Sequence, residues 1–301
     1  MLYGILNITT NIKEIINFIK EKPSLVVITS TFLLVTLGSV QTVDAVNYAI
    51  YDKKTCESLG GLWDLYRCQL ISMTIKENDI FIIDGNAVLI SQTLDNFGKI
   101  IITNGYLINA GGNITNHDSG YIINKEKGHT INNIGIFHNE GIIKNESKGT
   151  ISNNKKGIFT NTKTGIIFND RGTYLFNMGV FYNNNIIFNY RATMYIGNHS
   201  ASSEELGLHA LSGTNFTDTF GIFNNQAGGI IFNKLGAIYV VKKSELNNGD
   251  KGLIFIDTGS SIVNLATIKN SNKFFINCGG FLLDYFSIDG PVIEIPCTYN
   301  S

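Results

Sequence analysis

Residues 120–145 read GYIINKEKGHTINNIGIFHNEGIIKN, which is one unit, Gly-x-[apolar]-x-Asn, written four times. The middle residue of the unit is almost always apolar, and the unit recurs every six to eight residues. Self-similarity at a short, fixed period is the signature of a solenoid, in which each repeat stacks on its neighbours. Further copies lie at residues 149–153, 157–161, 165–169, 179–183 and 229–233.

The unit has the length of a short strand, and side chains alternate between the two faces of a strand. The middle residue, such as Ile143 or Ile151, is therefore expected to point inward, and its mixed neighbours outward. By the same alternation the Gly and the Asn also face inward, at the corners. Gly allows a positive φ and leaves room for the neighbouring backbone. Asn tolerates the left-handed conformation and can pair with the Asn one coil away.

The connections are about three residues long, too short for hairpins with long arms. They predict an all-β fold, a parallel β-helix (β-solenoid) with one strand on each side of a coil. Three sides of eight residues give about 24 residues per coil and about eight or nine coils over residues 80–290. A two-sided coil of about 16 residues is the alternative. The irregular spacing departs from a strict hexapeptide repeat and favours a right-handed helix.

The composition agrees with an ordered, asparagine-rich chain. Its 301 residues include 37 Asn, 31 Gly and three Pro, and aromatic residues occur throughout. Lys and Arg (23) nearly balance Asp and Glu (24). No basic surplus exists to hold a phosphate backbone, so nucleic acid is not an expected partner.

Residues 1–45 are expected to serve export rather than the fold. An apolar run without charge covers residues 25–43, and Val43-Asp44-Ala45 places small residues where a signal peptidase reads them. Cleavage before Val46 is one reading. The other is an uncleaved helical anchor, because the run nearly reaches the roughly 20 residues that span a bilayer. Either way, most of the chain is expected outside the cytoplasm.

The four cysteines form one pair near each end of the expected mature chain, Cys56 with Cys68 and Cys278 with Cys297. An even number in an exported chain favours two disulfides. Zinc is the rival reading, but no Cys-x-x-Cys occurs. Solenoids need caps at both ends, which predicts caps at residues 46–79 and 278–301 around a solenoid at 80–277. The repeat lapses at residues 191–219, where we expect an excursion that could hold a short helix.

No catalytic motif is found, and no catalytic, cofactor-binding or metal-binding residue is expected. Acidic residues are scattered and share no position in the unit. Asp170-Arg171 is an adjacent acid–base pair in a turn, and a surface ion pair is expected there. His129 and His138 fall at outward positions of consecutive strands, with no metal role expected.

Four triplets match the acceptor of N-glycosylation. Asn113 faces outward in the predicted register, and Asn198 and Asn215 flank the excursion, so these three are the candidate glycosylation sites. Asn145 is a corner residue facing inward, and we expect it to stay unmodified.

These features resemble the Asn- and Gly-rich surface proteins of microbes that fold as pectin-lyase-like or adhesin-type β-helices. The stretch TCESLGGLW at residues 55–63 with Cys68, then DGNAVLI from Asp84, then the Gly-x-Ile-x-Asn run, is similar to archaeal cell-surface proteins. The likeness covers most of residues 55–280. Such proteins mostly lack an assigned activity, so the resemblance implies no catalytic residue.

Two functions are compatible with the sequence. The first is an exported structural or adhesive cell-surface protein without catalytic activity, released or anchored through residues 25–43. Its partners would be cell-envelope components, surface glycans or further copies of the chain. The alternative is a carbohydrate-active β-helix enzyme or sugar-binding module, with its cleft beside residues 190–220.

Overall fold

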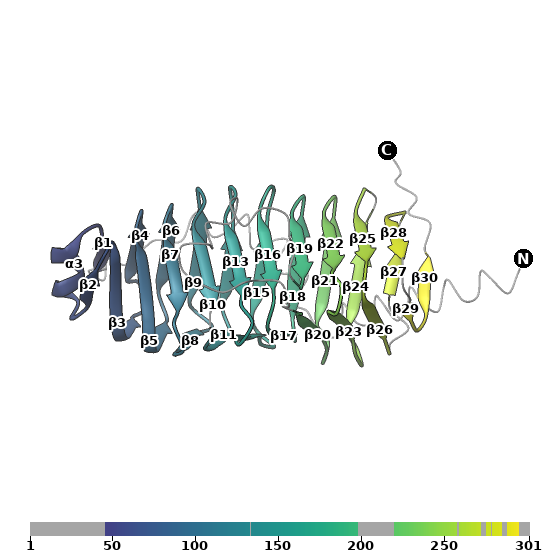
Figure 1. The fold of residues 1–301 in the computed structure, drawn as a ribbon, viewed down its shortest axis with the longest axis horizontal. Coiled ribbons are helices and arrows are strands. Elements are labelled where there is room, and N and C mark those ends of the chain that lie inside the picture. The colour runs from purple at the N-terminus through teal and green to yellow at the C-terminus, as the bar shows by residue number, and fades with distance from the viewer. Residues whose placement is uncertain are drawn as a thin grey trace, which may run out of the picture. The chain divides into compact units, whose positions relative to one another are not determined.

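The computed structural model describes residues 46–132, 134–197, 220–257, 259–271, 275–277, 279–284 and 288–294. They form a β-solenoid whose strands follow one another in a single stack from β1 to β30 (Figure 1). The expected leader, residues 1–45 with the apolar run 25–43, lies outside the described residues. In the described ranges, the one short helix is neither long nor apolar enough to cross a membrane.

Each coil has three sides, and each side is a column of parallel strands. The first side holds β1 (Asn47–Ile50), β4 (Ile80–Asp84), β6 (Lys99–Thr103), β9 (Tyr121–Lys125), β12 (Ile142–Asn145), β15 (Ile166–Asn169), β18 (Ile186–Tyr190), β21 (Ile230–Lys234), β24 (Leu253–Ile256), β27 (Phe275–Asn277) and β30 (Val292–Glu294).

The second and third sides share two long strands at the amino-terminal end, β3 (Arg67–Ile75) and β5 (Ala87–Asn96), which run along both sides. The second side continues with β7 (Tyr106–Asn109), β10 (His129–Asn132), β13 (Thr150–Asn153), β16 (Tyr174–Asn177), β19 (Thr193–Ile196), β22 (Ala237–Val240), β25 (Ser261–Asn264) and β28 (Phe281–Asp284). The third side continues with β8 (Asn113–Asn116), β11 (Ile136–Asn139), β14 (Ile158–Asn161), β17 (Val180–Asn183), β20 (Ile222–Asn225), β23 (Glu245–Asn248), β26 (Thr267–Asn270) and β29 (Ile288–Asp289).

The three-sided coil and the parallel pairing agree with the prediction. From β9 to β27, every strand pairs with the third strand along, as β10 does with β13 and β13 with β16. Coil length varies because the corners differ in length: Ile151 pairs with Leu175, 24 residues on, and Leu175 with Met194, 19 residues on. The first side has nine strands within residues 80–277, from β4 to β27. This number agrees with the eight or nine coils expected.

The core is built from the middle residues of the repeat, which point inward as predicted. On the third side, four of them are phenylalanines whose rings stack coil upon coil, with centroids 4.6–4.7 Å apart. All four are fully buried. Stacked rings at the strand spacing add a small attraction to the burial of each ring, which is the larger stabilising contribution. The four rings are Phe137, Phe159, Phe181 and Phe223.

The repeat asparagines form ladders inside the corners. On the third side each Nδ2 donates to the Oδ1 of the asparagine in the next coil, at 2.6–2.8 Å. These side chains are almost completely buried, so the bonds offset the desolvation of the amides. This ladder holds Asn96, Asn116, Asn139, Asn161, Asn183, Asn225, Asn248 and Asn270. A second ladder on the first side runs through Asn124, Asn145, Asn169, Asn189 and Asn233.

The repeat glycines are needed for space rather than for a positive φ. A Cβ on Gly135 would lie 2.3 Å from the carbonyl oxygen of Gly112 in the preceding coil, and a Cβ on Gly141 only 2.2 Å from that of Gly120. Neither glycine has a positive φ. Of the two reasons expected for Gly, only the close approach of the backbone holds at these positions. Asn likewise serves the ladder and not a left-handed turn.

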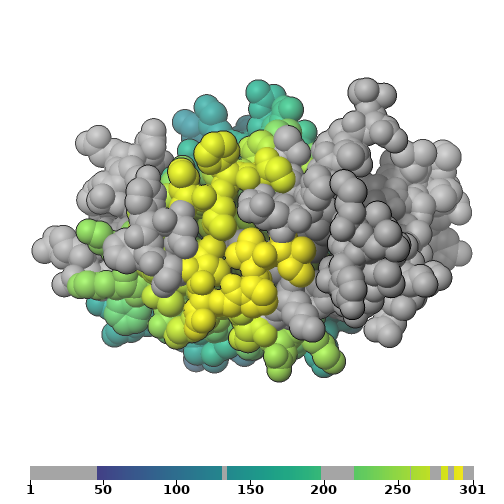
Figure 2. All heavy atoms as spheres, turned by 90° about the vertical axis from the view of Figure 1, so that its right-hand side faces the viewer, coloured from purple at the N-terminus to yellow at the C-terminus, as the bar shows by residue number. Residues whose placement is uncertain are grey.

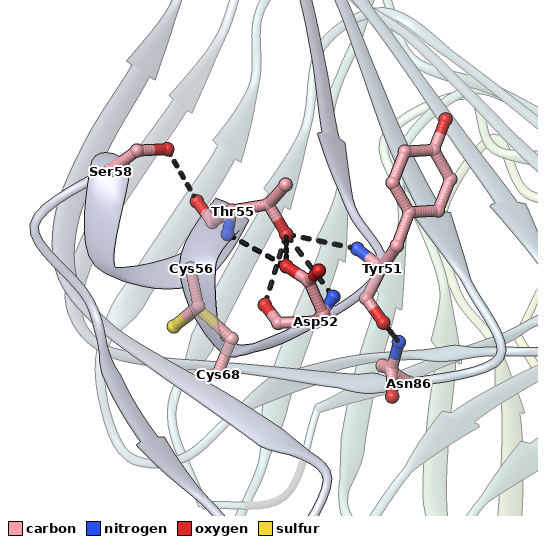
Figure 3. The surroundings of a disulfide bond; sticks show 7 residues. All are labelled: Tyr51, Asp52, Thr55, Cys56, Ser58, Cys68 and Asn86. Atoms are coloured by element: carbon pink, nitrogen blue, oxygen red, sulfur yellow. Dashed lines mark hydrogen bonds between the residues drawn. A yellow bond between two sulfur atoms is a disulfide. The ribbon is translucent and has the colours of Figure 1, made fainter.

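The amino-terminal cap contains a disulfide between Cys56 and Cys68, as expected (Figure 3). Cys56 lies in the short helix α3 (Lys53–Ser58), and Cys68 begins β3, which pairs in antiparallel fashion with β2 (Leu62–Asp64). Trp63 of β2 packs against the core. The Asp52 carboxylate accepts a hydrogen bond from the Thr55 backbone amide, which holds the pKa of Asp52 below its usual value. Parallel pairing already begins at β1, inside residues 46–79.

The carboxyl-terminal end of the stack is formed by β28, β29 and β30, and Figure 2 looks onto this end. Here the inward-facing Leu282, Ile288 and Val292 are only partly buried. Cys278 and Cys297, expected to form the second disulfide of a cap at 278–301, lie outside the described residues.

The excursion expected at residues 191–219 begins later than predicted. Strand β19 pairs in register with β16 and β22, so residues 193–196 belong to the stack. Its last residue, Ile196, occupies the place that Asn177 takes in β16. The strand was therefore missed because it lacks the asparagine of the repeat. Residues 198–219 lie outside the described residues.

Candidate functional site

The corner between the first and second sides, here called the first corner, is made of short turns that follow the first-side asparagines. Two of these turns place consecutive residues in the left-handed region, Glu126 and Lys127 (φ 48° and 75°) and Ser147 and Lys148 (φ 46° and 70°). A left-handed pair turns the chain sharply. The turn residues therefore project from the stack, and equivalent turns lie one above another in successive coils.

A groove with a volume of about 540 Å³ runs over the first corner. Its lining comes from the corners of four consecutive coils, those that follow β6, β9, β12 and β15. All the lining side chains are exposed, and none is aromatic. They are Asn104, Glu126, Lys127, Ser147, Lys148, Arg171 and Gly172.

The groove is positively charged, with three cations (Lys127, Lys148 and Arg171) against the single carboxylate of Glu126. The chain as a whole has a formal charge of −1, so this is a local excess. The ion pair expected between Asp170 and Arg171 does not form. Asp170 instead accepts a hydrogen bond from the backbone amide of Arg171 at 2.7 Å. The Arg171 side chain contributes to the groove lining instead.

The Glu146 carboxylate of the same corner is bound by Lys144 of the first side. Its ammonium forms a short ion pair with Glu146, and the hydrogen bond to Glu146 raises the pKa of Lys144. Asp170 adds to the same shift by its charge. Neighbouring Tyr121 is half-buried, and this desolvation raises its pKa. The carboxylates of Glu146 and Asp170 thus lie near the Lys144 ammonium. The three cations of the groove are separate from this group.

His129 keeps the outward position expected for it, one residue before the inward-facing Thr130, but it is not open to solvent. Its side chain is only 7% exposed and stacks on Tyr106 of the preceding coil, with ring centroids 4.8 Å apart. Burial lowers its pKa to about 4. The cause lies in the adjacent coil, which a strand-by-strand reading does not include. His138, the third residue of β11 on the third side, is half-buried.

The corner between the third and first sides holds the one histidine in the described part of the chain that lies between two carboxylates. His117 Nε2 lies 3.1 Å from Asp95 Oδ1, and its Nδ1 lies 3.3 Å from Glu140 Oε2. The ring stacks on Phe97 with centroids 3.9 Å apart. Each carboxylate contacts one ring nitrogen, so both nitrogens of His117 already have a partner. Among the residues described, no cluster suited to holding a metal ion occurs.

The sequon asparagines differ in exposure as the register predicted where they are described. Asn113 is exposed at the start of β8, and Asn145 is fully buried in the first-side ladder. Asn198 and Asn215 lie outside the described residues. Whether any sequon carries a glycan stays a prediction.

The sequence analysis did not find the groove. Lys127, Lys148 and Arg171 are separated by 21 and 23 residues and occur in turns of different sequence. They come together only when the length of each coil is known. The residue spacing alone is a poor signal, because the coils vary in length.

Comparison with known proteins leaves the family open. No protein-family model and no curated protein matches the chain. Among solved structures, the chain is similar to the crystal structure of a TibC-catalyzed hyper-glycosylated TibA55-350 fragment. It is 12% identical, with 83% of this chain and 96% of that chain covered, and has a TM-score of 0.26. At this TM-score the likeness carries no argument about function.

Proposed function

We propose that the chain is an exported structural or adhesive protein of the cell surface, without catalytic activity. The observation that carries this proposal is the continuous stack of three-sided coils, held by buried asparagine ladders and closed by a disulfide at its amino-terminal end. Such a stack is stiff and presents its outward side chains in straight rows. Disulfides persist outside the reducing cytoplasm, which supports export.

The proposal includes a right-handed coil and a leader at residues 1–45 that directs export. The leader is either cleaved before Val46 or retained as an anchor through residues 25–43. Partners would be envelope components, surface glycans or further copies of the chain. Sequencing the amino terminus of the protein isolated from its own cells separates a released protein from an anchored one. A protein found in the cytosol with its leader intact would contradict export.

Adhesion is tested with the full-length chain immobilised on a surface and incubated with intact cells or isolated envelopes. We expect retention that a coating of albumin does not give. The matched control is the chain unfolded in denaturant and reduced before coating, which keeps the composition and removes the stack. Equal retention by the folded and unfolded chains would contradict a function based on the solenoid.

The second candidate function is a carbohydrate-active enzyme. Glycoside hydrolysis uses two carboxyl groups on either side of the scissile bond. Asp95 and Glu140 are the two described carboxylates gathered about one histidine, although both are bonded to His117. Incubation with a panel of polysaccharides distinguishes the two functions. New reducing ends, lost in the Glu140→Gln variant, would establish the enzyme and overturn the proposal above.

A further inference from the structure

We infer that the groove over the first corner binds a linear acidic polysaccharide, one whose sugars carry carboxylates or sulfates along the chain. This inference deepens the proposed function, because it names the ligand of a surface-binding protein. It rests on the charge, the spacing and the lining of the groove.

The charges of the groove are available to a ligand. Lys127, Lys148 and Arg171 are exposed, and none of them takes part in an ion pair with another described residue. Glu126 is the one carboxylate in the lining. Three cations without partners in a concave site raise the local concentration of anions and favour their binding.

The spacing of the cations fits a polymer better than a single anion. One cation comes from each of three consecutive coils, after β9, β12 and β15. Successive coils are about 4.8 Å apart, so the cations follow one another in a row along the stack. Lys127 and Lys148 occupy the same place in their turns, and Arg171 lies one place earlier in its own. A linear chain lying along this row meets one cation after another. A small anion would contact one or two of them.

The lining selects among polyanions. Single-stranded nucleic acids are held by aromatic side chains on which bases stack, and the groove has none. A membrane surface is bound by apolar side chains together with basic ones, and the lining offers no large apolar side chain. Asn104 and Ser147 instead add hydrogen-bonding groups to the lining beside the cations, which suit the hydroxyls of sugars. A volume of about 540 Å³ is in the range of small-ligand sites and holds a short run of sugars.

The left-handed turns of the first corner place its two lysines in the same way in successive coils. Lys127 and Lys148 follow Glu126 and Ser147, and all four have positive φ. The two lysines therefore leave the stack in the same direction. Glycine adopts this conformation without a steric cost, so Lys127→Gly and Lys148→Gly remove the charge, keep the turn and create no sequon.

The test compares two triple variants of the full-length chain. The first carries Lys127→Gly, Lys148→Gly and Arg171→Gln. The matched control removes three exposed lysines at the other two corners, as Lys155→Gln, Lys156→Gln and Lys163→Gln. Both lose the same charge, and circular dichroism with thermal melting checks that both are folded. Dissociation constants are measured for alginate, a linear polyuronate, and for its neutral propylene glycol ester. A second pair of ligands, dextran sulfate and dextran, distinguishes sulfates from carboxylates.

We expect the native chain to bind at least one of the two acidic polymers and neither neutral one. The groove variant should bind about tenfold or more weakly, since several surface ion pairs act together, and the control variant within about twofold of the native chain. Binding should weaken as ionic strength rises from about 0.05 M to about 0.5 M. Equal loss in both variants, equal binding of the neutral polymers, or no binding of either acidic polymer would overturn the inference. Tighter binding of single-stranded DNA or of anionic lipid vesicles would overturn it too.

Failure of this inference is distinguishable from failure of the proposed function. If the groove variant adheres to cells as well as the native chain does, the surface function stands and the groove is not its site. If the native chain binds acidic polymers through the groove but adheres to no cell or envelope, the inference stands and adhesion falls.

Discussion

A buried asparagine in a ladder makes several bonds at once, so its loss should be costly. Asn169 Oδ1 accepts from Asn145 at 2.8 Å and from Thr173 Oγ1 at 2.7 Å, and its Nδ2 donates to Asn189 at 2.7 Å. Asn169→Ala is expected to lower the free energy of unfolding by about 2–4 kcal/mol. Denaturant unfolding measures this against Asn113→Ala, an exposed asparagine for which about 0.5 kcal/mol or less is expected. Equal losses would show that the ladder adds nothing.

His129 should make stability depend on pH. Its pKa is lowered by burial to about 4, from 6.5, so between these values the unfolded chain takes up a proton that the folded chain does not. Stability from this group is complete above pH about 6.5 and falls as the pH is lowered toward about 4, by about 3 kcal/mol in all. His129→Phe keeps the stack on Tyr106 and should remove this part of the pH dependence. His138→Phe is the control, and a slope altered equally in both variants would contradict the assignment to His129.

The sequon asparagines give a test of the register in the native protein. We expect peptide mapping with intact mass to find Asn113 glycosylated and Asn145 bare, since Asn145 is buried and bonded on both sides. A transferase acting on the folded chain reaches Asn113 and not the ladder. A glycan on Asn145 in folded protein would mean that the corner is not closed as described.

At the residue scale, the sequence predicted which side chains face inward, because this follows from alternation within one strand. It did not predict contacts between side chains or backbone groups of neighbouring coils. The inward Asn145 and Ile151 follow from a period of two. His129 stacks on Tyr106, and Gly135 is required because the backbone of Gly112 lies close to it; both neighbours are about 20 residues away in the sequence. Arg171 forms no ion pair with Asp170 because the Asp170 carboxylate bonds the backbone within the turn. No single-strand pattern contains that information.

At the scale of elements, the disulfide should stabilise the amino-terminal cap chiefly by restricting the unfolded chain. Cys56 and Cys68 are 12 residues apart, and a loop of that size gives about 3 kcal/mol. The double variant Cys56→Ser, Cys68→Ser is expected to unfold at lower denaturant concentration by that free energy. Reducing agent should bring the native chain to the same midpoint if the second pair of cysteines is left unchanged. No shift in the variant would mean that the cap is held by β2 and α3 alone.

Element boundaries were predictable wherever the full unit was present. Strands such as β12 and β15 end at the asparagine of the repeat, as expected. Strand β19 was missed because Ile196 replaces the asparagine, although its alternation of buried and half-buried residues is regular. Pairing with β16 and β22 therefore determines that residues 193–196 form a strand more than their own sequence does.

At the scale of the whole stack, protection from hydrogen exchange should differ along the chain. Interior strands have a neighbour on each side and fully buried middle residues, such as Ile143 and Ile167. The last strands are β28, β29 and β30, whose core residues are only partly buried. Exchange followed by mass spectrometry should be slowest in peptides from β9 to β24 and faster from β28 onward. Uniform protection to residue 294 would indicate a closed carboxyl-terminal end.

The asparagine ladder of the third side has one direction throughout. Asn96 Oδ1, at its amino-terminal end, accepts no hydrogen bond, and Asn270 Nδ2, at the other end, donates to the Pro291 carbonyl at 2.6 Å. Eight amide dipoles thus add head to tail inside the stack, with the negative pole at the first coils and the positive pole at the last. The ladder therefore gives the solenoid an electrical polarity along its stack, so that its two ends are different in charge as well as in sequence.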